Sequence, residues 1–230
     1  MAQTETLLRK VMRQLSVESR DLLEESLRRF KTKYNMTPEN LRRALEDPVE
    51  DEHLRAFAAW TIGAIRDLSF AGILENLLRT EPPSELLWEV TKALCSLRQG
   101  EEVFRSMLGA IRPENRSAAA YGLGHLSAKS AVRDLSRLLL APQEDPKVRG
   151  HAAEALGNIA APEALEPLLE ATYDPSVEVR FWSTFALGNI GGPRAVRRLQ
   201  ELTLTDSEIL DGWWTVSEEA AAALEKLRRQ

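Results

Sequence analysis

The 230-residue sequence predicts an all-α protein: a right-handed α-solenoid of about six helical hairpins behind an N-terminal helical cap. Two observations predict this fold. The motif Ala-Leu-Gly-Asn-Ile ends at Ile159 and again at Ile190, an offset of 31 residues. Apolar residues inside each copy follow the helical period of about 3.6 residues, and no β-type alternation extends beyond a few residues.

The same frame recurs along most of the chain. Anchors related to Ala-Leu-Gly-Asn-Ile occupy residues 61–65, 93–97, 122–126 and 223–227, with offsets of 29 to 37 residues between successive copies. The longest offset, 37 residues, comes from an insertion at 203–214. Six units result, and we predict that residues 47–230 form a single continuous domain of stacked repeats.

Each unit reads as two helices. The first helix of the fourth unit carries one apolar face with small residues beside it, which allows a neighbouring helix to approach closely; this face comprises Val148, Ala152, Ala155, Leu156 and Ile159. The second helix starts near a proline, Pro162 in one unit and Pro193 in the next, a residue tolerated in a first helical turn. Asp145 and Asp174, each followed by proline, suit turns and helix N-caps.

Residues 1–46 lack the repeat. Amphipathic patterns predict helices over Thr4–Leu15 and Val17–Tyr34, and Thr37 followed by Pro38 predicts the start of a third helix. Solenoid ends need a polar cap over their exposed core, so we interpret this segment as an N-terminal helical cap. Its formal charge is +3, against −8 for the repeats, so a contact surface is the alternative interpretation.

Residues 145–159 and 174–190 resemble the HEAT repeat family in its short form of roughly thirty residues, known from phycobilin lyase subunits and many bacterial adaptor proteins. The shared pattern is Asp-Pro, then Val-Arg, then Ala-x-x-Ala-Leu-Gly-x-Ile. The resemblance implies that the recurring arginine bridges to an acidic group or carbonyl of the adjacent turn and sets the stacking register. Leu87 and Ser217 interrupt this predicted ladder, which comprises Arg55, Arg116, Arg149 and Arg180.

Composition argues against several kinds of function. The net charge of −5 and the lack of a continuous basic stripe disfavour binding to nucleic acid. One cysteine, Cys95, excludes an internal disulfide, and no apolar run reaches the length of a membrane span. The three histidines fall in different units, so we expect no metal, no cofactor and no small-molecule ligand. No catalytic motif is present, and with no signal peptide we expect a cytoplasmic protein that is not an enzyme.

Large aromatic residues lie on the helical face opposite the apolar core stripe. Such residues suggest a partner-binding surface, because monomers rarely expose broad apolar patches. The alternative is intramolecular: the N-terminal helices would cover two of these residues, and the inserted loop, with its two tryptophans, would fold back over two others. The candidates are Phe57, Trp60, Trp182, Phe185, Trp213 and Trp214.

Basic residues on the second helices form the other candidate surface, which we expect to line a concave wall. An acidic peptide could bind them through charge-assisted hydrogen bonds. The alternative is lateral ion pairing between neighbouring helices, since Arg133, Glu166 and Arg197 share one register. The candidate cations are Arg133, Arg137, Arg194, Arg197 and Arg198.

These observations predict a non-catalytic scaffold or adaptor that binds another protein on the solenoid surface. The first alternative is a phycobilin-lyase-like subunit that handles a tetrapyrrole or a chromophore-bearing protein, and it rests on the resemblance of the repeats alone. The second is a HEAT-like DNA glycosylase, which Trp213 and Trp214 superficially suggest and which the net charge of −5 disfavours.

Overall fold

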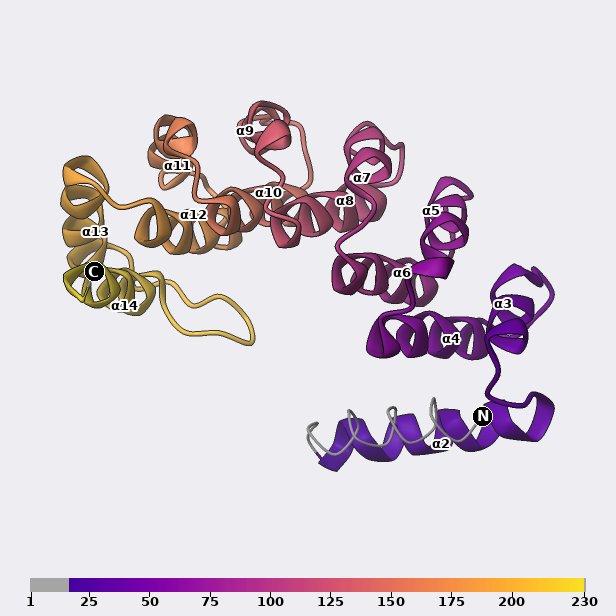
Figure 1. Ribbon diagram of the computed structural model, residues 1–230. Coiled ribbons are helices and arrows are strands. Elements are labelled where there is room, and N and C mark those ends of the chain that lie inside the picture. Colours follow the sequence, from indigo (N-terminus) through magenta and orange to yellow (C-terminus); the bar gives the residue numbers. More distant parts are fainter. Residues whose placement is uncertain (1–16, 230) are drawn as a thin grey trace. The chain divides into compact units, whose positions relative to one another are not determined.

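The computed structural model describes residues 17–229 (Figure 1). Helices make up the regular secondary structure of this part of the chain, apart from one isolated bridge between Ile209 and Thr215. The predicted fold class, an all-α solenoid of helical hairpins, is confirmed. Within residues 17–229, no helix is both long and apolar enough to cross a bilayer.

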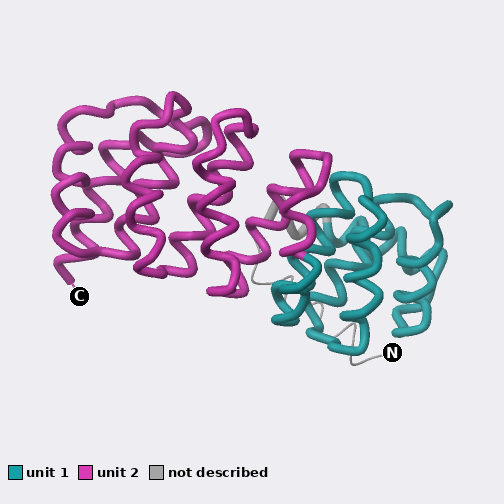
Figure 2. The backbone as a smooth tube through the Cα atoms, turned by 90° about the horizontal axis from the view of Figure 1, so that it is seen from above, with its two compact units in different colours: residues 1–103 teal, residues 104–230 magenta. Residues whose placement is uncertain are grey.

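Contacts divide the chain into two compact units, residues up to Val103 and residues from Phe104 (Figure 2). The division falls inside α7 (Glu101–Met107), whereas the boundary predicted at residue 46 lies within unit 1. That residues 47–230 form one continuous domain stays a prediction. Unit 1 contains α2 (Val17–Lys33), α3 (Pro38–Glu46), α4 (Glu52–Ile65), α5 (Ala71–Arg79) and α6 (Ser84–Leu97).

Unit 2 continues the alternation of first and second helices. A single turn of 3-10 helix precedes each of α9 and α11, so α11 begins at Leu165, shortly after Pro162, near which this second helix was expected to start. The unit contains α8 (Pro113–His125), α9 (Val132–Leu139), α10 (Pro146–Ile159), α11 (Leu165–Ala171), α12 (Val177–Ile190), α13 (Pro193–Thr205) and α14 (Val216–Arg228).

The N-terminal helices form largely where the sequence predicts them. The Thr37 hydroxyl accepts a hydrogen bond from the backbone N–H of Asn40 at 3.3 Å and caps α3, which begins at Pro38. In α2, Phe30 is fully buried and packs on Phe57 of α4. The helix predicted over Thr4–Leu15 lies outside the described residues.

First helices of unit 2 pack very closely because glycine and alanine meet at their crossings. A Cβ atom on Gly124 would lie 2.7 Å from the Cα of Ala155, and one on Gly157 would lie 2.7 Å from the Cα of Ala186. No side chain fits into such a contact. The Ala-Leu-Gly anchor therefore sets the helix spacing. In unit 1, Cys95 takes the glycine place of the anchor, and burial raises the pKa of its thiol to about 12.

The second helices of unit 2 are spaced more widely. Helices α8, α10 and α12 lie in a row with α9, α11 and α13 on one side of it (Figure 1), and α11 barely touches α9 or α13. In a curved stack the closely spaced layer is the inner one. The expectation that second helices line a concave wall is therefore wrong, since the small residues lie on the first helices.

The insertion predicted at 203–214 begins slightly later. Helix α13 runs to Thr205, and the irregular segment comprises residues 206–215, here called the 206–215 loop. This loop lies on the side of α12 away from the second helices (Figure 1).

Candidate functional site

Five aromatic rings from α12 and the 206–215 loop form one cluster. Trp213 lies 5.2 Å from Trp182 and 5.7 Å from Phe181, and Trp214 lies 5.9 Å from Phe181, measured between ring centroids. Phe185 extends the cluster along α12, at 5.6 Å from Trp182. Most of these pairs meet edge to face, the arrangement that the charge distribution of aromatic rings favours.

Local hydrogen bonds hold the loop in this position. The Trp214 indole N–H donates to the carboxylate of Glu219 at 2.9 Å, and the backbone N–H of Val216 donates to the carbonyl of Glu208 at 3.1 Å. Thr215 and Glu218 form a capping box that starts α14 directly after the loop. These hydrogen bonds therefore fix the conformation of the loop beside α12 and hold its two tryptophans against this helix.

The cluster remains open to solvent although its members cover one another. Phe181 is buried and Trp182 and Phe185 are half-buried, but Trp213 is 47% and Trp214 44% exposed. The intramolecular alternative is thus correct in part, because the loop does fold over Trp182. The loop does not bury the aromatic residues of α12 but adds its own tryptophans to them, so the exposed apolar surface becomes larger.

Glycine on α10 lets this surface extend across two helices. A Cβ on Gly150 would lie 3.3 Å from the Trp182 ring and 2.9 Å from the Glu178 side chain. Phe185 lies equally close to the Cβ position of Gly157. Glu154 is on the same face of α10 as both glycines, so it lies between the places where Trp182 and Phe185 cross.

Two carboxylates within this surface are partly removed from water. Burial raises the pKa of Glu154 and that of Glu178, and His151 partly offsets both shifts. Among the described residues, neither carboxylate makes an ion pair with lysine or arginine. We call this surface the aromatic face, defined by Trp182, Phe185, Trp213, Trp214, Glu154 and Glu178.

Phe57 and Trp60 do not belong to the aromatic face. Phe57 was expected on a contact surface, but it is only 3% exposed and packs on Phe30 at 5.6 Å. Helix α2 covers it, as the intramolecular alternative predicts. Trp60 is half-buried, stacks on Phe57 at 5.9 Å and lines a cleft of about 660 Å³ formed by α2, α4 and α6.

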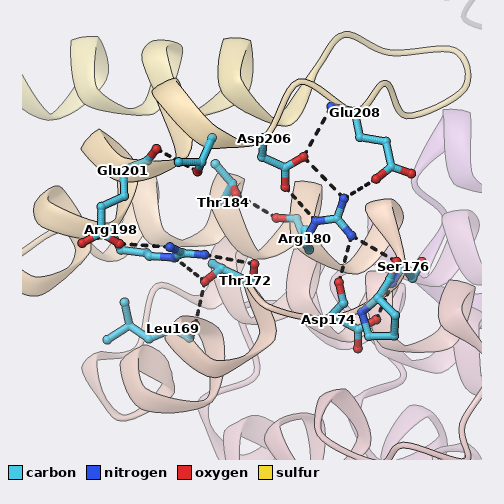
Figure 3. Close-up of polar contacts among 12 residues, drawn as sticks. Leu169, Thr172, Asp174, Ser176, Arg180, Thr184, Arg198, Glu201, Asp206 and Glu208 are labelled. Carbon is cyan, nitrogen blue, oxygen red and sulfur yellow. Dashed lines mark hydrogen bonds and ion pairs between the residues drawn. The ribbon is translucent and has the colours of Figure 1, made fainter.

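The recurring arginines connect neighbouring loops. Arg116 and Arg149 each donate to a carbonyl of the loop before their own helix and to a carboxylate of the loop before the next first helix, Glu144 and Asp174 respectively. Arg180 likewise donates to the backbone carbonyl of Asp174 and to the carboxylate of Asp206, and it also donates to the carboxylate of Glu208 (Figure 3). Arg55 donates to the Leu45 carbonyl.

The cations on the second helices fall into two separate groups. Arg133 and Arg137 of α9 line a cavity of about 810 Å³ that reaches residues 161–167. Arg194, Arg197 and Arg198 of α13 line a smaller one, of about 360 Å³, against α11. The lateral ion pair predicted for Glu166 forms with Arg194, in place of Arg133 or Arg197.

Several residues of these surfaces escaped the sequence analysis. Glu154 and Glu178 belong to the aromatic face, the buried Phe181 packs against its two loop tryptophans, and Lys129 and Leu140 line the larger cavity. The density of aromatic residues between 181 and 214 was the available signal for Phe181. The carboxylates carry no signal in one sequence, because their burial depends on the neighbouring repeat.

Comparison with solved structures supports the fold. The whole of an engineered protein aligns with 85% of this chain, with a TM-score of 0.57 and 24% sequence identity. A designed armadillo repeat protein was solved in complex with the peptide (KR)4. The whole of that protein aligns with 84% of this chain, with a TM-score of 0.56 and 20% sequence identity. At these identities the likeness concerns the fold alone.

Curated relatives point to enzymes. Deoxyhypusine hydroxylase-B of Oryza sativa subsp. japonica is 37% identical over 107 residues, which cover 44% of this chain and 35% of that protein. The deoxyhypusine hydroxylase of Homo sapiens is 36% identical over 102 residues, covering 42% of this chain and 34% of that protein. The match spans about a third of the length of these relatives.

These relatives overturn the functional expectation drawn from the sequence. The chain was expected to be a non-catalytic scaffold and not an enzyme, with a lyase-like subunit or a glycosylase as alternatives, whereas the curated relatives are named hydroxylases. The repeats carry no information about such an activity, because the repeated residues specify helix packing.

A family model for HEAT repeats matches residues 101–176 and 139–225, which together cover more than half of the chain. The matched residues include the Ala-Leu-Gly anchors and three arginines of the ladder, Arg116, Arg149 and Arg180. The chain belongs to the HEAT repeat family.

Proposed function

We propose that this chain is a cytoplasmic protein-modifying enzyme, or the substrate-binding part of one, and that it holds a segment of its protein substrate on the aromatic face. The observation that carries the proposal is the exposure of Trp213 and Trp214, 47% and 44%, while both rings are fixed against Phe181. Tryptophan on an ordered surface is typical of the residues that dominate protein–protein binding energy.

The surroundings of the tryptophans support the same proposal. The rings are held by α12 and by the capped start of α14, so little conformational entropy is lost when a segment binds. Glu154 and Glu178 provide hydrogen-bond acceptors within the apolar area. Such a combination binds an apolar side chain and fixes the orientation of its polar neighbours.

Hydroxylation of deoxyhypusine is the activity that the relatives' names suggest. Hydroxylation by dioxygen draws on a redox-active metal or an organic cofactor. Residues 17–229 contain no group of three or more His, Cys, Asp or Glu side chains placed to hold a metal ion. The described residues therefore do not fit a metal centre.

Binding of a deoxyhypusine-bearing protein tests the proposal. We expect calorimetry to detect a complex with the wild-type chain, and we expect the Trp182→Ala/Trp213→Ala variant to weaken it on the order of 30-fold, as for a binding hot spot. Leu204→Ala is the matched control, because Leu204 is a large exposed apolar residue on α13 and is not among the residues that define the aromatic face. Circular dichroism checks that both variants are folded.

Mass spectrometry of the same mixture under air tests the activity separately. Gain of one oxygen atom by the bound protein would support hydroxylation. Binding that depends on Trp182 without any mass gain would remove hydroxylation and leave substrate recognition. Absence of both binding and mass gain would overturn the proposed function.

A further inference from the structure

Two equivalent gaps separate the second helices of unit 2. The first gap lies between α9 and residues 161–167 and encloses about 810 Å³. The second gap lies between α11 and α13 and encloses about 360 Å³. Both gaps carry cations from the helix on one side, so their charges can be compared directly.

The second gap carries as many carboxylates as cations, because Glu166, Glu170 and Glu201 line it together with Arg194, Arg197 and Arg198. Arg194 forms an ion pair with Glu166, and Arg198 forms one with Glu201 at 3.0 Å. The Arg198 guanidinium also donates to the Thr172 hydroxyl at 2.8 Å (Figure 3) and lies 3.8 Å from the centre of the Tyr173 ring. The lining of this gap therefore has no excess of positive charge to attract an added anion.

The first gap keeps a cationic excess. Lys129, Arg133 and Arg137 line it, and Glu163 is the carboxylate among its lining residues. Arg137 lies 3.4 Å from Asp134 in an exposed pair of the kind that contributes little to stability. Among the described residues, neither Lys129 nor Arg133 makes an ion pair.

The floor of the first gap is apolar. Val132 and Leu140 of the α9 region face Ala161 and Pro167, and Leu140 remains 37% exposed. Arg133 and Arg137 are four residues apart on α9, so their side chains lie on the same face of this helix. A free inorganic anion would use the cations and leave the apolar floor uncovered.

We propose that the first gap binds an acidic segment of a partner protein. Its carboxylates would accept hydrogen bonds from Arg133 and Arg137, and an apolar side chain between them would cover Leu140 and Pro167. Charge complementarity favours such a segment, because three cations and one carboxylate line the gap together with apolar side chains. This site is independent of the proposed function, because α9 and the 206–215 loop lie on opposite sides of the first helices (Figure 1).

Fluorescence anisotropy with a labelled synthetic peptide of alternating Glu and Leu tests the inference. A peptide of the same length with Gln in place of Glu is the control ligand. We expect saturable binding of the Glu peptide that weakens as salt is added, and a loss of about tenfold or more in the Arg133→Gln/Arg137→Gln variant. Both arginines are exposed, so this variant should fold, which circular dichroism checks.

Arg194→Gln/Arg197→Gln is the matched control variant, since it removes two cations from the second gap. We expect it to bind the Glu peptide as the wild type does, and we expect Leu140→Gln to weaken binding through loss of the floor. Equal binding of both peptides, equal loss in both double variants, or no saturable binding would overturn the inference. Decanoate, a small anion with an apolar tail, is the last probe. If decanoate binds at Arg133 and the Glu peptide does not bind, the inference is also overturned, because the ligand would then be a small amphiphilic anion.

Discussion

The guanidinium of Arg116 makes two hydrogen bonds to the carboxylate of Glu144, at 2.6 and 2.7 Å, across 28 residues of sequence. Arg116 also donates to the carbonyls of Ala110 and Ile111. One side chain thus fixes the loop before its own helix to the loop before the next first helix. Both partners are largely buried, so the pair differs from an ordinary surface ion pair.

Arg116→Ala should therefore lower the free energy of unfolding by about 2–3 kcal/mol, because Glu144 would be left without its partner in a poorly solvated place. Urea denaturation measures the change. Arg194→Ala is the control, since Arg194 and Glu166 are both exposed and their pair should contribute at most about 1 kcal/mol. Equal losses in the two variants would contradict a special role for the ladder.

Glycine at the helix crossings should resist substitution. A Cβ on Gly63 would lie 2.9 Å from the Cα of Ala93, so Gly63→Ala has to push two helices apart and should cost about 1–3 kcal/mol. Gly72, in α5 of the same unit, has no atom within 4 Å of its Cβ position. Gly72→Ala should stabilise the protein by about 0.5–1 kcal/mol, as expected for a helical glycine. Thermal unfolding of both variants shows whether the two effects differ in sign.

Glu50 should make unit 1 sensitive to acid. Burial raises the pKa of Glu50, but hydrogen bonds from Lys33, Tyr34 and the Asp51 backbone N–H outweigh burial, so its pKa is lowered from 4.5. A lowered folded-state pKa stabilises the fold above the unfolded-state value, and this stabilisation is lost as the pH falls through the folded-state value.

The stability difference between wild type and Glu50→Gln should consequently be largest at neutral pH and shrink below pH 4.5. Denaturation at a series of pH values measures it. A difference that stays constant with pH would show that Glu50 acts through packing and not through its charge.

Phe57→Ala should destabilise unit 1 by about 3 kcal/mol, because Phe57 is buried between Phe30 and Trp60 and its removal leaves a cavity. Leu68→Ala is the control in the same unit, as Leu68 is 60% exposed and should change stability by less than about 0.5 kcal/mol. Chemical denaturation compares the two. A loss below about 1 kcal/mol for Phe57→Ala would contradict the covering role of α2.

Much of the fold was determined by the sequence alone. The spacing of apolar and small residues predicts the first helices, and Val148, Ala152, Ala155, Leu156 and Ile159 are all buried as expected. Thr37 and Pro38 predict the start of α3. These features are local, since they depend on helical periodicity and on the capping of a single helix end.

The tertiary structure decided which of these residues meet. The sequence could not show that α2 buries Phe57, that the 206–215 loop brings Trp213 to Trp182, or that glycine makes the first helices the inner layer. It also could not show that Glu166 neutralises Arg194 while Arg133 keeps its charge exposed. Each of these outcomes depends on the distance between side chains far apart in the chain. Helical periodicity fixes which face of a helix is apolar, and only packing fixes what covers that face.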